Sequence, residues 1–366
     1  MPNWSESMQQ TYEFYTVDPG TWKDVKLLTN VKSCTITRDI DADTLGSATI
    51  DVTESLGECY VRVYLITIQN GITEKHPLGT FLVQSPSTSF DGRVQSISMD
   101  AYTPLLELKE NQPPIGYYIP KNSNVLDLAY RLIREKARAP VVSPPVTEDA
   151  KMTLDYDFVA DPDNTWLTFI KEFIEGVNYS LSLDELGKIL FAPKQKTASL
   201  QPVWTYTDDN SSILLPELDI DRDMYGIPNV VEVLYSQGNR HYYSKVRNDN
   251  PNSPISTVSR GREITYRVTD PDLIGVPDAT DEVKEKQARA MVDEYAEQLL
   301  DSLSSLECTV SYTHGYCPVR IGDCVRLNYR RAGLSGLKAK VISQSLKCES
   351  GCQVQEKAVF TTNLWR

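Results

Sequence analysis

Two segments of the chain place carboxylates at alternate positions, a spacing that could line one face of a strand and bind a divalent cation. Residues 39–46 and 219–226 both read D-I-D-x-D-x-x-G, and an alternating β-branched run follows each of them. Calcium takes oxygen ligands, but its loops usually carry a glycine turn among the ligands and a distal bidentate acid, and neither is evident here. We therefore interpret both runs as solvated strand edges or interface charges, with a calcium site as the alternative.

The C-terminal cysteines are the second group of residues that could bind a metal. Zinc sites favour cysteines paired two to four residues apart, and only Cys348 and Cys352 approach this spacing. Cys308 and Cys324 stand among alternating apolar residues, where a small buried thiol fits. We expect buried free thiols and no metal. The alternative metal ligands are Cys308, Cys317, Cys324, Cys348 and Cys352, with His314 nearby.

Residues typical of catalytic sites are scarce. The chain has three histidines and contains no H-E-x-x-H, no G-x-S-x-G and no glycine-rich phosphate loop. Acid pairs such as Asp184 and Glu185 fall in turn-like sequence, where solvated carboxylates are the usual explanation. We therefore predict that the protein is not an enzyme and uses no cofactor.

Residues 236–262 are locally basic in an otherwise acidic chain. The segment is polar and interrupted by prolines, which predicts a long ordered loop or arm, and loops of this length usually carry function. Opposed potentials set register and orientation in assemblies. We predict contact with an acidic neighbouring subunit, with a solvated loop as the alternative. The basic residues are Arg240, His241, Lys245, Arg247, Arg260 and Arg262.

The elements that position these residues are mainly strands. Alternating apolar residues and a Gln69-Asn70-Gly71 turn predict a first antiparallel β-barrel domain over residues 1–110. Strands resume near Trp204 and predict a second β-barrel domain over residues 203–366. This second domain would carry the basic arm 236–262 and a long helix over residues 281–303.

Residues 111–202 have a different character. Proline-rich connections flank two amphipathic periods, one capped by Ser123 or Asn124 and the other by Asp163, and a hairpin follows. The sequence therefore predicts a small α+β insert between two tail-tube-like antiparallel β-barrel domains, in a chain whose fold class is α+β and mainly β.

A partial internal repeat suggests that one β-rich domain was made twice. Besides the carboxylate motif, residues 83–101 and 341–358 share a strand, a turn with glycine and a second strand. We predict that residues 39–52 and 219–233 are equivalent strands of two barrels. A protein built from two copies of a barrel often imitates a higher symmetry than its own.

Length and charge limit the classes of function. A chain of 366 residues with 40% hydrophobic content can bury two or three cores. The net charge of -13 argues against a protein that grips the phosphates of nucleic acid. The N-terminus lacks the pattern of a signal peptide, and no apolar run approaches the roughly 20 residues that span a bilayer. We expect synthesis in a cytosol and no membrane insertion.

Several segments in order carry a resemblance to a known family. They are I-T-R-D-I-D-A-D (36–43), I-P-N-V-V-E-V (227–233), the arm sequence 248–262, the long helix, and P-V-R-I-G-D-C-V-R-L (318–327). Together the chain resembles the phage tail hub proteins. These are the baseplate hub of contractile phages and the N-terminal hub part of tail-associated proteins, including those of phage-like bacteriocins.

The resemblance implies a structural homotrimer whose barrels form a pseudo-sixfold ring. The ring would adapt the hexameric tail tube to a threefold tip or spike and form part of a channel through which DNA passes without specific binding. The implied partners are the tail tube or distal tail protein, the tape-measure protein, and a spike or receptor-binding tip protein. The implied location is the virion, at the tail tip or baseplate that attaches to the host cell, after assembly in the host cytoplasm.

The resemblance also implies roles for single residues. Pro228 and Asn229 would shape the entry to the second barrel, and Gly322 and Asp323 would form a structural turn before one of its strands. Ser253, Pro254, Arg260 and Gly261 would place the arm against a neighbour. With the basic residues of the arm, the predicted interface residues are Arg240, Lys245, Arg247, Ser253, Pro254, Arg260, Gly261 and Arg262.

A tail-tip protein that binds or degrades the cell wall is the alternative function. Sugar sites use exposed aromatic platforms beside acids, and the 20 tyrosines of this chain could include such a platform.

Overall fold

The structure is a computed structural model that describes residues 2–90, 92–93, 95–147, 151–210, 212–273, 276–277 and 280–365. The fold is α+β and mainly β, as the sequence predicts. The chain divides into two compact units. Unit 1 comprises Met1–Leu218 and Ser311–Ala358, and unit 2 comprises Asp219–Val310 and Val359–Arg366.

The first half of the unit 1 sheet follows the order β3-β4-β7-β6-β5-β1-β2, with antiparallel neighbours throughout. Successive side chains of a strand point to opposite faces, and the inward-facing apolar residues of these strands share one core. The strands are β1 (Gln9–Val17), β2 (Asp24–Leu28), β3 (Val31–Asp39), β4 (Gly46–Val52), β5 (Tyr60–Gln69), β6 (Ile72–Phe90) and β7 (Gln95–Tyr102).

The second half of the sheet is joined to the first by one strand pairing. Strand β19 runs antiparallel to β3, from Ser343 opposite Asp39 to Lys347 opposite Thr35, so both halves form a continuous thirteen-stranded sheet. The strands of this half are β12 (Pro202–Thr207), β13 (Leu214–Asp221), β17 (Ser305–Gly315), β18 (Cys324–Asn328), β19 (Leu337–Lys347) and β20 (Gln353–Asn363), and the 3-10 turn η3 (Arg330–Ala332) follows β18.

The insert of unit 1 folds around its own core, in which helices α2 and α3 pack with strand β10. The Asn124 side chain caps α2, as predicted, by accepting from the backbone of Asp127. Thr165 caps α3 through a reciprocal capping box with Thr168, so the prediction of Asp163 is wrong. The elements are α1 (Leu106–Lys109), β8 (Tyr118–Ile119), α2 (Val125–Lys136), β9 (Phe158–Val159), α3 (Trp166–Glu175), β10 (Tyr179–Leu183), β11 (Ile189–Pro193) and η2 (Thr197–Ser199).

The turn between β10 and β11 holds the insert against the sheet. The Leu186 carbonyl accepts hydrogen bonds from Trp22 Nε1 at 2.7 Å and Arg62 Nη2 at 3.2 Å. The carboxylate of Glu185 pairs with the guanidinium of Arg320 and is 11% exposed. The interpretation of Glu185 as a solvated turn carboxylate is therefore wrong, because the turn docks instead of facing solvent.

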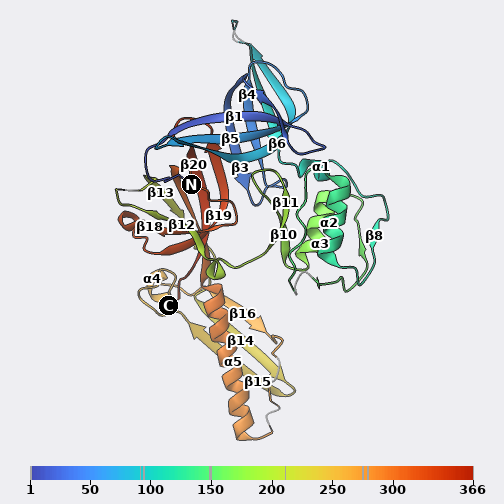
Figure 1. Ribbon diagram of the computed structural model, residues 1–366. Helices are drawn as coiled ribbons and strands as arrows, with labels where there is room; N and C mark the ends of the chain where they lie inside the picture. The colour runs from blue at the N-terminus through green and yellow to red at the C-terminus, as the bar shows by residue number, and fades with distance from the viewer. Residues whose placement is uncertain are drawn as a thin grey trace. The chain divides into compact units, whose positions relative to one another are not determined.

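Unit 2 is a three-stranded sheet covered by one long helix (Figure 1). Strand β14 pairs antiparallel with β15 and parallel with β16, and the apolar stripe of α5 packs on the sheet. The Asp281 side chain caps α5, whose bounds agree with the predicted helix to one residue. The elements are β14 (Val230–Gln237), β15 (Arg240–Arg247), α4 (Thr257–Arg260), β16 (Thr265–Thr269) and α5 (Glu282–Leu303).

The predicted equivalence of residues 39–52 and 219–233 is wrong. The strand after the first motif is β4, which lies between β3 and β7, whereas the strand after the second motif is β14 in the separate sheet of unit 2. Both strands are half-buried, and alternation of β-branched residues is typical of any such strand. The short motif therefore does not determine which strands are neighbours. Of the predicted domain 203–366, residues 219–310 and 359–366 belong to unit 2, and the rest belongs to unit 1.

The predicted arm is shorter than its sequence suggests. Residues 240–247 form strand β15, and Gly238 makes the hairpin turn with a φ of 60°. In β15 the exposed polar side chains alternate with buried Tyr242 and Ser244. The many charged residues mask this alternation in the sequence, so the segment resembles a loop. Only residues 248–264, the arm loop, connect β15 to β16.

Candidate functional site

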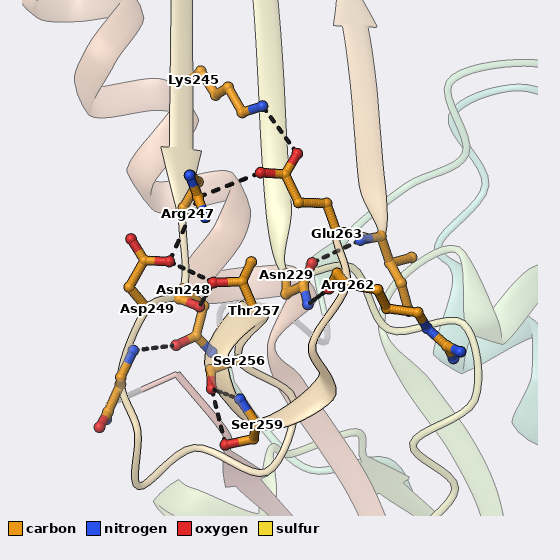
Figure 2. A network of polar contacts seen from close by, with 12 residues as sticks. Asn229, Lys245, Arg247, Asn248, Asp249, Ser256, Thr257, Ser259, Arg262 and Glu263 are labelled. Atoms are coloured by element: carbon orange, nitrogen blue, oxygen red, sulfur yellow. Dashed lines mark hydrogen bonds and ion pairs between the residues drawn. The ribbon is translucent and has the colours of Figure 1, made fainter.

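The arm loop, which contains most of the predicted interface residues, is closed by one buried amide. Asn229 Nδ2 donates to the carbonyls of Ile255 and Arg262, each at 3.0 Å, and its Oδ1 accepts from Ile264 N at 2.7 Å (Figure 2). Asn229 is fully buried at the start of β14. A single side chain therefore joins the middle of the loop to its end.

A second amide organises the first half of the loop. Asn248 Nδ2 donates to Ser253 Oγ at 2.9 Å, and the carbonyl of Asn248 accepts from Thr257 N at 2.9 Å. Ser253 is buried and its hydroxyl also donates to the Leu364 carbonyl, so this residue stabilises the loop from within. Pro254 is exposed, and Gly261 ends α4 with a φ of 62°.

Three of the six predicted basic residues form ion pairs inside their own unit, and His241 Nδ1 lies 3.0 Å from Ser236 Oγ. Arg240 lies 3.0 Å from Glu285, and Lys245 lies 3.0 Å from Glu263. Arg247 lies 3.5 Å from both Asp249 and Glu263. These pairs are partly exposed, so they contribute little stability, but they reduce the positive potential that the arm presents.

Arg260 and Arg262 differ in what they contact. Arg260 donates to the carbonyls of Ile227 and Met224, each at 2.7 Å, and so holds the segment that leads into β14. The Arg262 side chain is exposed and points away from the loop network (Figure 2), and among the described residues no ion pair to it is found. Arg262 is therefore the predicted interface residue whose charge is least compensated.

Gly322 and Asp323 form a tight turn before β18. The turn is fixed on β19 by hydrogen bonds from Gly322 N to Val341 O at 2.8 Å and from Val341 N to Asp323 O at 2.9 Å. Gly322 has a φ of 90°, a conformation that favours glycine. Asp323 Oδ2 accepts from Arg320 N at 2.9 Å, and burial raises the pKa of this carboxyl above its ordinary value.

The interior of the second half of the sheet holds a polar cluster that the sequence reasoning missed. Glu356 on β20 and His314 on β17 are fully buried, with His314 Nε2 3.4 Å from Glu356 Oε2. Gln344 Nε2 donates to Glu356 Oε2 at 2.6 Å. The hydroxyl of Tyr206 lies 3.1 Å from His314 Nε2, and that of Tyr312 donates to Glu356.

The electrostatics of this cluster favour an ionised pair. Burial by itself lowers the pKa of His314, but contacts with Cys317 and Glu356 outweigh it and raise the pKa to about 10. Burial and the nearby Glu356 raise the pKa values of Tyr206 and Tyr312 well above normal, so both hydroxyls stay protonated and can donate. The cluster therefore satisfies a buried charge instead of leaving a reactive group free.

The polar cluster also reaches the first half of the sheet. Arg38 on β3 donates from Nη1 to Gln344 Oε1 at 3.0 Å and from Nη2 to the Leu78 carbonyl at 2.7 Å. Arg38, Gln344 and Glu356 thus form one chain of hydrogen bonds across the β3–β19 pairing. The sequence does contain a signal for this cluster. His314 and Glu356 each occupy an inward-facing position in a strand whose side chains alternate with a period of two, which predicts that both are buried.

The five candidate metal ligands are not all gathered in one place, because Cys348 and Cys352 share one core and Cys308, Cys317 and Cys324 lie outside it. Cys308, Cys317, Cys324, Cys348 and Cys352 are buried free thiols, and in the described ranges no group of three or more His, Cys, Asp or Glu residues is arranged to hold a metal ion. Likewise, no helix in the described part of the chain combines the length and apolarity that a membrane crossing requires.

Comparison with known proteins identifies the fold. No family model matches the chain, and no curated protein matches it in sequence. Among solved structures, a tail protein from Neisseria meningitidis MC58 superposes with a TM-score of 0.59 at 13% identity, over 97% of this chain and 98% of that one. The 43 kDa tail protein of prophage MuSo2 from Shewanella oneidensis superposes with a TM-score of 0.55 at 12% identity, over 96% and 98%.

The chain therefore has the fold of phage tail proteins over nearly its whole length. The two sheet halves, the insert and the helix-covered unit are all within the superposed range. The resemblance noted from the sequence motifs is confirmed at the level of the fold.

Proposed function

We propose that this protein is a structural subunit of a phage tail or phage-like particle, a trimeric hub that adapts the hexameric tail tube to a threefold tip or spike. The observation that carries the proposal is the continuous sheet, in which two β-rich halves are fused through β3 and β19 in a chain with the fold of tail proteins. A fused pair allows three copies to supply six β-rich sheet halves, a number that matches a sixfold tube.

The polar chain across the β3–β19 pairing supports this role. A ring that matches a tube needs a fixed relation between the two halves of each subunit. Arg38 donates one directional hydrogen bond to Gln344 across the pairing, and Glu356 anchors Gln344 from within the second half. Directional contacts specify one arrangement better than apolar contacts, which tolerate sliding.

The remaining features of the proposal follow from charge and exposure. Arg262 would contact an acidic neighbouring subunit, because opposite potentials fix orientation. The net charge of -13 suits a channel that DNA passes without binding. The partners would be a tail tube or distal tail protein, a tape-measure protein, and a spike or receptor-binding tip protein, in a virion assembled in the host cytoplasm. The role would be structural and not enzymatic.

The mass of the purified protein at micromolar concentration tests the proposal. We expect three times the chain mass by light scattering or native mass spectrometry, and threefold rings with six peripheral densities in negative-stain images. A monomeric mass that persists after addition of the particle's tube protein, with no ring in the images, would overturn the hub assignment.

A tail-tip protein that binds the cell wall is the second candidate. The insert exposes Tyr118 by 57% and Tyr156 by 63%, with the carboxylates of Asp155 and Asp157 beside Tyr156, which are groups that sugar sites use. Glycan binding by the isolated protein that is lost in the double variant Tyr118→Ala/Tyr156→Ala would favour this function. Unchanged binding in that variant, or none in the wild type, would count against it.

A further inference from the structure

Three buried thiols lie together where the two halves of the unit 1 sheet meet. Cys34 is on β3, Cys348 directly follows β19, and Cys352 precedes β20. All three are free, and all three belong to the same apolar core. Neither the polar cluster nor the arm loop uses them.

The register places Cys34 and Cys348 directly opposite each other. Strands β3 and β19 pair Ile36 with Leu346 and Thr35 with Lys347, so the next opposed positions are Cys34 and Cys348. The backbone confirms this step, because Cys348 N donates to Cys34 O at 2.9 Å.

Both thiols also point to the same side of the sheet. Cys34 is two residues from buried Ile36, and Cys348 is two residues from buried Leu346, so the period of two sends all four side chains into one core. Cys34 and Cys348 share one backbone hydrogen bond, opposed residues of a hydrogen-bonded pair have Cα atoms about 5.5 Å apart, and disulfides commonly join Cα atoms about 4.4–6.8 Å apart. The geometry therefore admits a bond without backbone movement.

We propose that Cys34 and Cys348 are a reversible disulfide site that locks the β3–β19 pairing when the protein meets a low-molecular-weight disulfide. The Cys348 thiolate attacks one sulfur of the oxidant and releases its first thiol. The Cys34 thiolate then attacks the mixed disulfide and releases the second thiol. Two protein thiols are oxidised, one oxidant disulfide is reduced to two thiols, and the two protons go to the departing thiolates.

Cys352 is the competing thiol in this cluster. It lies four residues from Cys348 across the turn 349–351, has a φ of 37°, and is fully buried. A Cys348–Cys352 bond would close only that turn, whereas a Cys34–Cys348 bond joins the two sheet halves. The opposed register favours the second bond, because Cys348 N donates to Cys34 O one step beyond the last paired residues of β3 and β19.

Exchange at this site is expected to be slow. The contact with Cys34 and burial raise the pKa of the Cys348 thiol, and burial raises the pKa of Cys352 to about 12. A low thiolate fraction at neutral pH slows attack on a disulfide. The bond should therefore form over hours and not during handling, which suits a protein made reduced in a cytosol and used outside it. That use rests on the proposed function, while the bond itself depends only on the fold.

Peptide mapping of the full chain tests the proposal. The protein is incubated with oxidised glutathione at about pH 8.5, where more thiolate is present, and digested without reduction. We expect a cross-linked peptide pair that contains Cys34 and Cys348 and disappears on reduction. The melting temperature of the oxidised protein should exceed that of the reduced protein by about 5–10 °C.

Single variants provide the controls. Cys34→Ser and Cys348→Ser should each abolish the cross-link and the shift in melting temperature, whereas Cys324→Ser, which removes a buried thiol outside the cluster, should abolish neither. Free thiols at Cys34 and Cys348 after complete exposure to oxidant, or a Cys348–Cys352 bond in their place, would overturn the proposal. Light scattering on the same samples separates this result from the trimer prediction.

Discussion

Glu356 is the residue on which the interior of the second sheet half depends. Its carboxylate contacts His314, Tyr312 and Gln344 in a fully buried site, so the charge is satisfied only while all partners remain. Removing one partner of such a cluster leaves the others with unpaired charge or hydrogen-bonding groups.

Replacement of Glu356 by glutamine should therefore destabilise unit 1 strongly. Glu356→Gln leaves His314 with no compensating charge, and we expect the free energy of unfolding to fall by about 3–5 kcal/mol in urea titrations. Glu349→Gln makes the same change at an exposed position of the neighbouring turn and should alter stability by less than about 0.5 kcal/mol. Equal stability of both variants would contradict the ionised cluster.

The same cluster predicts a pH dependence. The pKa of His314 is raised from 6.5 to about 10 in the folded protein. A raised pKa means that the native state binds the proton more tightly than the unfolded state. Its contribution is therefore complete below about pH 6.5 and is lost as the pH rises to about 10.

Urea titrations between about pH 6 and 10 measure this contribution as the difference in stability between wild type and His314→Gln. The advantage of wild type should shrink steadily across the window. An advantage that grows with pH would show that His314 is neutral when buried.

At the scale of elements, the β10–β11 turn decides how the insert is held. Gly187 has a φ of 77°, and a Cβ at this position would lie 2.8 Å from Thr80 Cβ and 3.2 Å from Pro104 Cγ. The turn thus needs glycine for two reasons, the left-handed backbone and the close approach to β6. The hydrogen bonds from Trp22 and Arg62 to Leu186 depend on that approach.

Gly187→Ala should loosen the insert from the sheet. We expect faster amide exchange around residues 184–187 and a loss of stability of about 2–4 kcal/mol, because backbone strain adds to the clash. Gly116→Ala has a similar φ of 79° but nothing within 4 Å of the new Cβ, so it isolates the backbone cost of about 1 kcal/mol. Similar effects of the two substitutions would mean that the turn does not dock.

At the scale of the whole molecule, assembly should depend on the uncompensated charge of the arm loop. In the proposed trimer Arg262→Glu places an acid against an acidic neighbour, and we expect the trimer to dissociate at concentrations at least about tenfold higher than wild type. Lys286→Glu makes the same charge change at an exposed position of α5 and should leave the mass distribution unchanged. Sedimentation velocity over a dilution series measures both.

Much of the local structure could be predicted from the sequence. The Asn124 cap and the inward stripe of α5 depend on spacing within a few residues, so the helices over 125–136 and 282–303 follow from local rules. The apolar alternation of the strands likewise predicted a mainly β fold. The same alternation misled the assignment of residues 219–233 to a barrel, because period two does not say which strand is a neighbour.

The chemistry between distant residues was decided only by the tertiary structure. His314 and Glu356 are separated by 42 positions, and Arg38 and Gln344 by 306. Cys34 and Cys348 become opposed only through the register of β3 with β19. The sequence by itself determined the elements and their inward faces, since these depend on local periodicity. The structure decided which elements meet, because strand pairing joins residues whose separation along the chain leaves no local signal.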